Sequence, residues 1–333
     1  MTTSPMPPLT WQAALTTWQL ALGWDLAVLL ACVGYLVGLR RLRRAGQEWP
    51  RRRAACFAAG LVSIVLATNS SIAAYSSAYF SMHMIQHLTL IMVAPYLLIA
   101  AHPLDLWQRA ARDPERVRSV LLSRPVSVLT NSMTGFLLYA VVLAATHLTP
   151  FMQLMLQHHV LHHVEAVVYL VSGYLCFLAV IGLEPTRWQR LSYPLRLAFL
   201  MFAMAPDTGI GVVLMGADHV LFPDFARMSP DGTAGLLDDQ RLGGAIMWVG
   251  GDGLMALAML VLAVLWIRST GPQAGFGDWL ESARRSALSG TAGEAGGDVI
   301  AESADVDADE RALADYNAML ARLNGRTSGG DAR

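Results

Sequence analysis

Seven long apolar runs constrain this 333-residue chain more than any other feature of its sequence. A membrane-spanning helix needs about 20 mostly apolar residues to cross the hydrocarbon core. Runs of about that length lie at residues 19–39, 54–74, 83–101, 125–146, 160–183, 197–216 and 242–267. Charged residues make up only 15% of the chain, whereas soluble domains carry about 25%. We therefore expect an all-α membrane protein, with a bundle of seven transmembrane helices over residues 19–268.

The arginines predict the orientation of this bundle. They gather in the segments that follow the first, third and fifth runs, at Arg40, Arg41, Arg43, Arg44, Arg51, Arg52, Arg53, Arg109, Arg112, Arg116, Arg118, Arg124, Arg187, Arg190 and Arg196. The alternate segments hold only Arg227 and Arg241. Because short Arg-rich loops stay in the cytoplasm, we expect residues 1–18 outside the cell and the C-terminus inside. This topology accounts for the basic clusters without a nucleic-acid partner.

The tail, residues 269–333, differs in composition from the rest of the chain. It is rich in glycine, alanine, serine and acidic residues, which is typical of a disordered cytoplasmic segment. Apolar side chains return at helical spacing between residues 312 and 323. We expect a short helix there, which serves either as a surface helix or as a docking helix for a partner.

Histidines gather at one face of the expected bundle. Eight of the nine fall at outer ends of the apolar runs, at His83, His87, His147, His158, His159, His162, His163 and His219. His83 and His87 are four residues apart and therefore share one helix face. The run QHHVLHH, residues 157–163, supplies two more pairs at the same spacing. Such a concentration at one depth favours a shared site over separately solvated side chains.

The residue types around these histidines indicate a metal. If the fifth helix begins near Phe151, then Met152 and Met155 join the histidine stripe. Imidazole and thioether ligands suit copper, particularly Cu(I), whereas zinc more often recruits carboxylate or thiolate. Glu165 is placed to orient a histidine ligand through its second ring nitrogen. The sequence thus predicts a copper site whose candidate ligands are His83, His87, His147, His158, His159, His162 and His163.

Two other roles remain open at this stage. A haem protein could use His87 and His162 as axial ligands from facing helices. A copper transporter would need a polar or methionine-lined path across the membrane. The hints of one are Met201, Met204 and Asp207 in the sixth run and Asp252 in the seventh. For these two carboxyl groups, a helix–helix hydrogen bond and a proton or ion step are equally open.

Three segments, residues 83–104, 161–177 and 239–248, resemble the polytopic CtaG-type family of cytochrome c oxidase assembly proteins. They read HMIQHLTLIMVAPYLLIAAHPL, LHHVEAVVYLVSGYLCF and DQRLGGAIMW. The resemblance extends over residues 20–268. Matched position by position, His83 and His87 fall in the first segment and His162 and Glu165 in the second. Ala166 stands where many members carry histidine.

In the third segment, the residues that match the family pattern are Asp239, Gln240, Met247 and Trp248. The resemblance implies a multi-pass protein of a bacterial inner (plasma) membrane that assembles a haem–copper oxidase and is not an enzyme. It also implies copper as the cargo that is handed over. The implied partners are cytochrome c oxidase subunits, a copper chaperone at the outer face and membrane lipid.

Overall fold

The computed structural model describes residues 8–182, 184–188, 191–230 and 232–269, together with Ala314 and Asn317. The chain divides into two units, Met1–Leu262 and Ala263–Arg333, and the first unit holds the site discussed below. Of the helix expected over residues 312–323, only Ala314 and Asn317 are described, and both are helical. The remainder of that expected helix lies outside the described residues.

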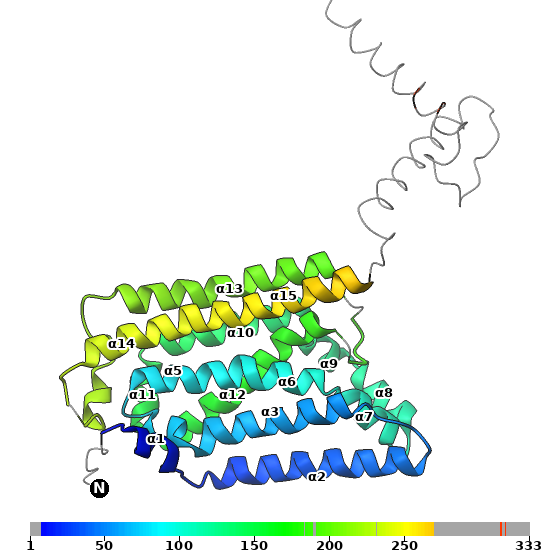
Figure 1. The fold of residues 1–333 in the computed structure, drawn as a ribbon, viewed down its shortest axis with the longest axis horizontal. Coiled ribbons are helices and arrows are strands. Elements are labelled where there is room, and N and C mark those ends of the chain that lie inside the picture. The colour runs from blue at the N-terminus through cyan, green and yellow to red at the C-terminus, as the bar shows by residue number, and fades with distance from the viewer. Residues whose placement is uncertain are drawn as a thin grey trace, which may run out of the picture. The chain divides into compact units, whose positions relative to one another are not determined.

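The first unit is built from long apolar helices that run side by side (Figure 1). The longer elements are α2 (Leu22–Arg44), α3 (Arg51–Asn69), α5 (Phe80–Leu88), the π-helical turn η1 (Thr89–Val93), α6 (Ala94–Ala100), α10 (Ser132–His147), α12 (His159–Ile181), α13 (Tyr193–Gly216), α14 (Leu236–Ala245), the π-helical turn η3 (Ile246–Gly250) and α15 (Gly251–Ser269). Short helices connect them, namely α1 (Trp11–Thr16), α4 (Ser71–Tyr75), α7 (Pro103–Ala110), α8 (Pro114–Leu121), α9 (Arg124–Leu129), α11 (Phe151–Gln157) and the 3-10 helix η2 (Pro223–Arg227).

Six of these helical stretches are long and apolar enough to cross a membrane. The number rises to seven if α10 and α11, which meet at a bend of 70°, form one broken span. The prediction of an all-helical protein with a set of membrane spans is therefore confirmed at six to seven candidates. The orientation of the bundle stays a prediction.

The fourth span differs from the expected 125–146. Its helix α10 begins only at Ser132, because the side chain of Asn131 accepts a hydrogen bond from the amide of Met133 at 2.9 Å and so caps the helix. The preceding residues form the separate helix α9. The polar first half of this run thus marks a helix boundary, while its second half forms the apolar helix.

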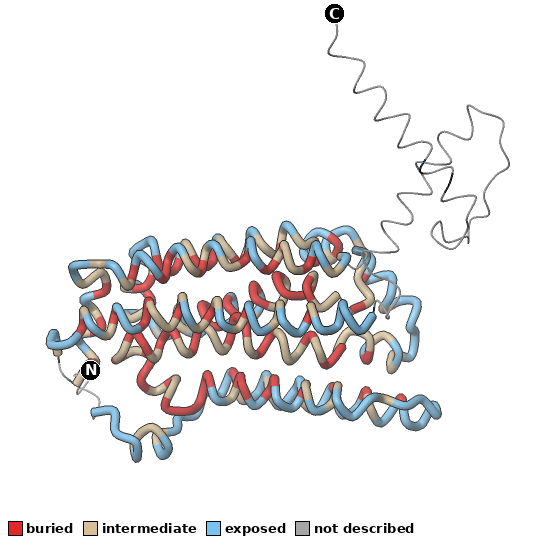
Figure 2. The backbone as a smooth tube through the Cα atoms, turned by 45° about the horizontal axis from the view of Figure 1, so that its top comes forward, coloured by how far each residue is buried: buried red, intermediate tan, exposed pale blue. Residues whose placement is uncertain are grey.

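The bundle is not equally packed throughout. Helix α12 packs against α10, α6 and η1, and buried residues follow these central helices in Figure 2. Only 11% of the apolar window of α2 is buried, compared with 56% for the stretch Phe80–Ala110. A helix that is apolar on most sides yet little covered by protein suits contact with lipid. The core of the protein therefore lies between α5–α6 and α12.

A glycine sets the close crossing of α12 over the third span. A β-carbon at Gly173 would collide with the backbone carbonyl of Ile91 in η1. In a regular α-helix this carbonyl would accept a hydrogen bond from residue 95, but Pro95 has no N–H. The crossing brings α12 directly against the helical stretch that continues from α5.

Candidate metal centre

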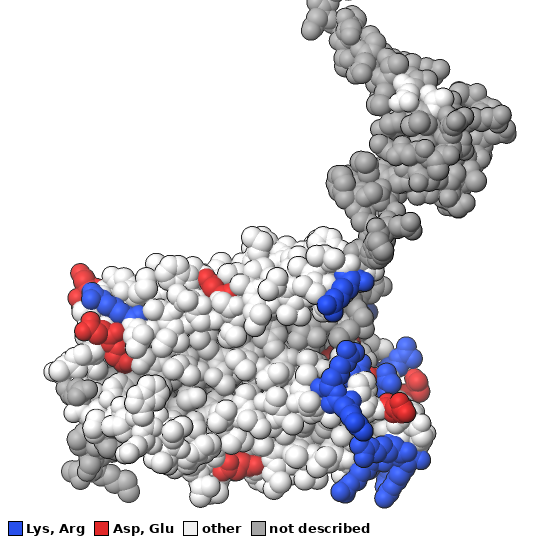
Figure 3. Space-filling model, in the orientation of Figure 1, with Lys and Arg blue, Asp and Glu red and all other residues white. Residues whose placement is uncertain are grey.

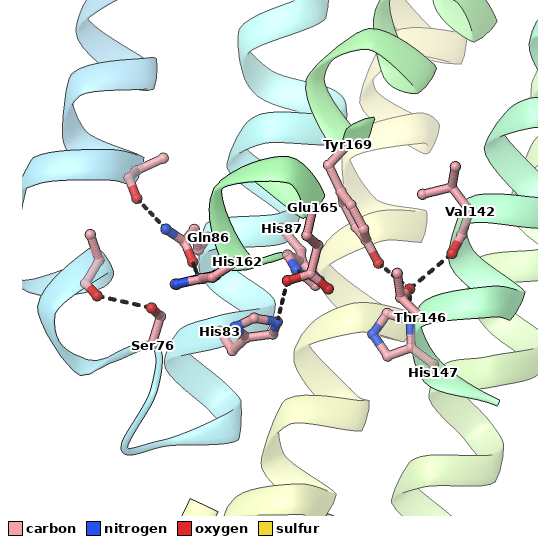
Figure 4. A network of polar contacts seen from close by, with 12 residues as sticks. Ser76, His83, Gln86, His87, Val142, Thr146, His147, His162, Glu165 and Tyr169 are labelled. Atoms are coloured by element: carbon pink, nitrogen blue, oxygen red, sulfur yellow. Dashed lines mark hydrogen bonds and ion pairs between the residues drawn. The ribbon is translucent and has the colours of Figure 1, made fainter. Parts of the chain in front are cut away.

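The centre of the site is a group of three buried side chains from two helices. His83 and His87 lie one turn apart on α5, and Glu165 reaches them from α12 (Figure 4). Their residues are 0%, 4% and 2% exposed. The Nε2 atom of His83 lies 3.6 Å from Oε2 of Glu165, and Nε2 of His87 lies 3.5 Å from Oε1. The i,i+4 spacing within α5 therefore brings the two histidines together, and the packing of α12 against the third span adds Glu165.

The polar atoms of this triad lack hydrogen-bond partners. Among the described residues, neither ring nitrogen of His83 or His87 and neither carboxyl oxygen of Glu165 has one. An unsatisfied buried polar group costs about 1–3 kcal/mol. One donor atom from each of the three residues lies within 4.8 Å of the others. Ligand atoms at about 2.0–2.2 Å from a shared ion would be spaced at up to about 4.4 Å, so a metal ion fits this group after only small adjustments.

His147, at the end of α10, points a further nitrogen toward the triad. Its Nδ1 lies 3.0 Å from the carbonyl oxygen of Leu143. Because a carbonyl oxygen only accepts, Nδ1 carries the proton, and in a neutral imidazole Nε2 then keeps its lone pair. Nε2 is buried and has no partner within the described part of the chain. The ring centroid lies 5.7 Å from that of His87, which places His147 as a candidate fourth ligand.

Tyr169 and Thr146 fix the surroundings of His87. The ring of Tyr169 stacks on His87 with centroids 3.8 Å apart. Its hydroxyl group lies 2.6 Å from Oγ1 of Thr146, which donates to the carbonyl oxygen of Val142 at 2.9 Å. Neither residue was singled out from the sequence, although Tyr169 follows Glu165 by four residues and so shares its helix face. That spacing was the available signal.

His162 lies beside the triad and lines a cavity in the protein. Its ring stacks near His83 with centroids 5.7 Å apart, and its Nε2 lies 3.2 Å from Oε1 of Gln86. The amide nitrogen of Gln86 donates to the carbonyl oxygen of Ala67 at 2.8 Å. Gln86, which the sequence analysis did not single out, thereby connects His162 to α3.

Two further predicted ligands, His158 and His163, are not brought to the triad. His158 and His163 are exposed, and the side chain of His159 lies outside the described part of the chain. The expected stripe required one helix from Phe151 onward, but His158 is extended and separates α11 from α12. Met155 is buried and lines a cavity next to His162.

Asp239, at the start of the last span, fixes the beginning of α5. Its carboxylate accepts hydrogen bonds from the amides of Phe80 at 2.6 Å and Ser81 at 3.4 Å, and from the Ser81 hydroxyl group. A carboxylate at a helix N-terminus satisfies amides that have no partner within the helix. Asp239 therefore positions the helix that carries His83 and His87.

Gln240 and Met247 have supporting positions in the same span. The side chain of Gln240 accepts from the amide of Leu221 at 2.7 Å and donates to the carbonyl oxygen of His219 at 3.3 Å. It thereby holds the loop between α13 and α14, while His219 itself pairs with Asp218 on the surface. Met247 is buried within η3, which packs against α5.

Three phenylalanines pack close to the triad. Phe80 is the first residue of α5, and Phe222 and Phe225 lie at the 3-10 helix η2. Phe80 stacks on Phe222 with centroids 5.0 Å apart and meets Phe225 edge-on at 5.7 Å. Phe225 in turn lies 6.1 Å from His83. These apolar rings, which we call the aromatic roof, offer no ligand atoms and exclude water from this side of the site.

Comparisons with known proteins identify one family and several relatives. Residues 33–269 match the model of the family described as cytochrome c oxidase caa3 assembly factor, Caa3_CtaG. The uncharacterized proteins Mb0105 of Mycobacterium bovis and MT0111 of Mycobacterium tuberculosis are each 31% identical over 274 residues, which are 79% of this chain and 41% of theirs. ML1998 of Mycobacterium leprae, also uncharacterized, is 30% identical over 246 residues, 71% of this chain and 37% of its own.

The chain therefore spans about two fifths of the length of the curated relatives it matches. No solved structure matches the chain.

Proposed function

Because the chain belongs to the Caa3_CtaG family of cytochrome c oxidase caa3 assembly factors, we propose that it holds copper for transfer to a caa3-type oxidase. The observation that carries this proposal is the buried group of His83, His87 and Glu165, whose polar atoms lack hydrogen-bond partners among the described residues. A cation shared by the three side chains would satisfy a nitrogen of each histidine and a carboxylate oxygen at once.

Each side chain has a distinct role in this proposal. His83 and His87 bind copper through nitrogen, Glu165 through oxygen, and His147 approaches through Nε2 as a fourth ligand. Tyr169 keeps the ring of His87 in place by stacking. Copper leaves by exchange of these ligands for those of the oxidase, so no covalent bond of a substrate is broken. The protein thus acts as an assembly factor and not as an enzyme.

The charge distribution supports an outer-face location for the site. Arginines gather around α7, α8 and the α2–α3 connection at one end of the bundle (Figure 3). His83 lies near the opposite end, close to the start of α5 and next to the outer loop held by Gln240. If the Arg-rich end faces the cytoplasm, the buried triad lies toward the outer side of a bacterial plasma membrane. Oxidase subunits and a copper chaperone would reach it there.

The ligand set also bears on the choice of metal. Two imidazoles and one carboxylate are found at catalytic zinc sites, so zinc is the competitor to test. The haem alternative is less favoured, because the ring of His87 lies 4.0 Å from that of His83 and 3.8 Å from Tyr169, centroid to centroid. The transporter alternative is less favoured, because Met201 on α13 is 65% exposed and because Asp252 on α15 accepts a hydrogen bond from Oγ1 of Thr208 on α13 at 2.7 Å, as in a helix–helix contact.

Copper binding by purified variants tests the proposal. The variant combines His83→Ala, His87→Ala and Glu165→Gln, because an unpaired carboxylate left buried would itself destabilise the fold. We expect the native protein to withdraw a single equivalent of Cu(I) from a chromogenic chelator, and the variant to withdraw none. Zinc added in excess should not displace the copper.

A matched control replaces the exposed His158 and His163 with alanine and should bind copper as the native chain does. Helix content and elution from a sizing column report whether each variant is folded. In cells that lack the native gene, the triad variant should leave the oxidase deficient in copper, whereas the control should restore it. Native-like copper binding by the folded triad variant would contradict the proposal.

A further inference from the structure

A cavity of about 280 Å³ lies beside the triad, and its lining includes none of the phenylalanines of the aromatic roof. Its wall includes residues of very different burial. Gln19 and His163 are exposed, whereas Gln86 and Ala166 are buried. The cavity therefore extends from the surface of the protein inward to the residue next to Glu165. It is large enough for several water molecules, each of which occupies about 30 Å³ in the liquid.

The inner end of the cavity adjoins the triad through His162. This residue lines the cavity, and its ring lies 5.7 Å from that of His83. Three residues further along α12, Glu165 belongs to the triad. Gln86 lines the cavity as well and lies between His83 and His87 in sequence. The hydrogen bond from Nε2 of His162 to Oε1 of Gln86 thus joins the wall of the cavity to the helix of the metal ligands.

The side chains along the cavity are suited to a soft cation. Met155, His162 and His163 contribute thioether and imidazole groups to its wall. Thioether and imidazole groups together are a ligand set suited to Cu(I). The aromatic roof offers no such ligand, so an ion that crossed it would lose its hydration without replacement.

Hydrogen bonds between separate segments hold the outer wall of the cavity in place. The amide of Gln19 donates to the carbonyl oxygen of Asn69 at 2.8 Å, and the hydroxyl group of Ser71 donates to the carbonyl oxygen of Ala14 at 2.7 Å. The Asn69 side chain also donates to the carboxylate of Asp25 at 2.7 Å. The segment before α2 is therefore fixed against the end of α3. Asp25, in the first turn of α2, holds its carboxylate against Asn69, next to Thr68 of the cavity wall, and a carboxylate attracts cations.

We propose that this cavity is the route by which Cu(I) reaches the triad, with His162 receiving the ion from the cavity and passing it to His83 and Glu165. The inference rests on the proposed function, because it presupposes copper in the triad. It goes further by assigning a binding site to the cavity and by giving Gln86 a role as the residue that positions His162. No bond order or oxidation state changes along the route, since the ion only exchanges ligands.

Plugging the cavity tests the route. Cys32 and Cys56, which are partly exposed, are first replaced by alanine, while Cys176 is fully buried and stays. Ser77→Cys then places a thiol in the cavity wall, where a bulky maleimide is attached. Cu(I) loading from a chelator is followed by stopped flow. We expect loading to slow by about tenfold or more, which corresponds to a barrier raised by about 1.4 kcal/mol, while the final copper content equals that of the unlabelled protein.

The matched control is Asp218→Cys, at a side chain that is 93% exposed and outside the cavity. The same label there should leave the loading rate unchanged. In a second variant, His162→Gln should also load slowly and still reach full copper content, a difference that a purely structural role would not produce. Equal loading rates for the two labelled proteins would overturn the route and leave copper binding in place. If the unlabelled protein takes up no Cu(I), the proposed function itself fails.

Discussion

At the residue scale, the triad consists of common residue types, two histidines and a glutamate, in an unusually buried position. A surface histidine is normally satisfied by water, but the imidazoles of His83 and His87 have none of their nitrogens bonded within the described residues. Glu165 was expected to orient a ligand through its second ring nitrogen. The structure places its carboxylate oxygens 3.5–3.6 Å from Nε2 of both histidines, in a group of three that could hold a metal ion. It therefore counts among the candidate ligands themselves.

Glu184, in the segment after α12, carries a prediction about pH. Its carboxylate accepts hydrogen bonds from the amides of Asp105 at 3.0 Å and Leu104 at 3.4 Å and so caps α7. Burial raises the pKa of Glu184 from 4.5 to about 7, although these amides act in the opposite direction. Because the folded state favours the proton, this group stabilises the fold most at low pH. Its contribution is lost as the pH rises from about 4.5 to about 7.

We expect Glu184→Gln to remove this part of the pH dependence, which amounts to at most about 3 kcal/mol for a shift of this size. The measurement is the thermal unfolding temperature in detergent between about pH 4 and pH 8, a window that includes both pKa values. Glu115→Gln, at a side chain that is 83% exposed, serves as the control and should keep the native slope. An unchanged slope in Glu184→Gln would show that this carboxyl group does not govern stability.

At the scale of elements, helix breaks place the functional side chains. The third span contains a π-helical turn between His87 and Pro95, and the fourth bends by 70° between α10 and α11. Because α12 begins only after the extended residue His158, the histidines of the 157–163 run do not form one face with Met155. Among the histidines of this run whose side chains the structure describes, His162 is the one whose ring stacks near His83.

The crossing of α12 and η1 leads to a prediction about stability. In Gly173→Ala, the new methyl group would collide with backbone atoms of Ile91, which cannot move aside as a flexible side chain could. We expect a loss of about 1–3 kcal/mol of unfolding free energy, as for other overpacked cores. Copper affinity should also fall, because α12 carries Glu165.

Gly209→Ala in α13 is the matched control, since no atom lies within 4 Å of a β-carbon built there. Both substitutions improve helix propensity by about 1 kcal/mol, so the difference between them isolates the collision. Thermal unfolding and copper titration in detergent measure both effects. Equal stability of the two variants would mean that the helices can separate at no cost.

At the scale of the whole molecule, the arginines around α7, α8 and the α2–α3 connection lie at one end of the bundle (Figure 3), whereas α5, which carries two residues of the triad, lies toward the other end (Figure 1). With the Arg-rich end in the cytoplasm, we expect a thiol at Asp218→Cys to react with a membrane-impermeant maleimide in intact cells. Ser119→Cys, in the exposed part of α8, should react only after the cells are broken. Both variants are made without Cys32 and Cys56. The reverse labelling pattern would place the triad at the cytoplasmic face.

The sequence alone determined the fold class, the approximate positions of the spans and the gathering of histidines near one end. These properties follow from local rules, namely the length of apolar runs and the 3.6-residue period that pairs His83 with His87. Only the tertiary structure decided that Glu165 completes the group, that Tyr169 and Gln86 support it, and that His158 and His163 remain on the surface. Contacts between helices depend on where each helix breaks and crosses, as at His158 and Gly173, and spacing within a single helix does not specify them.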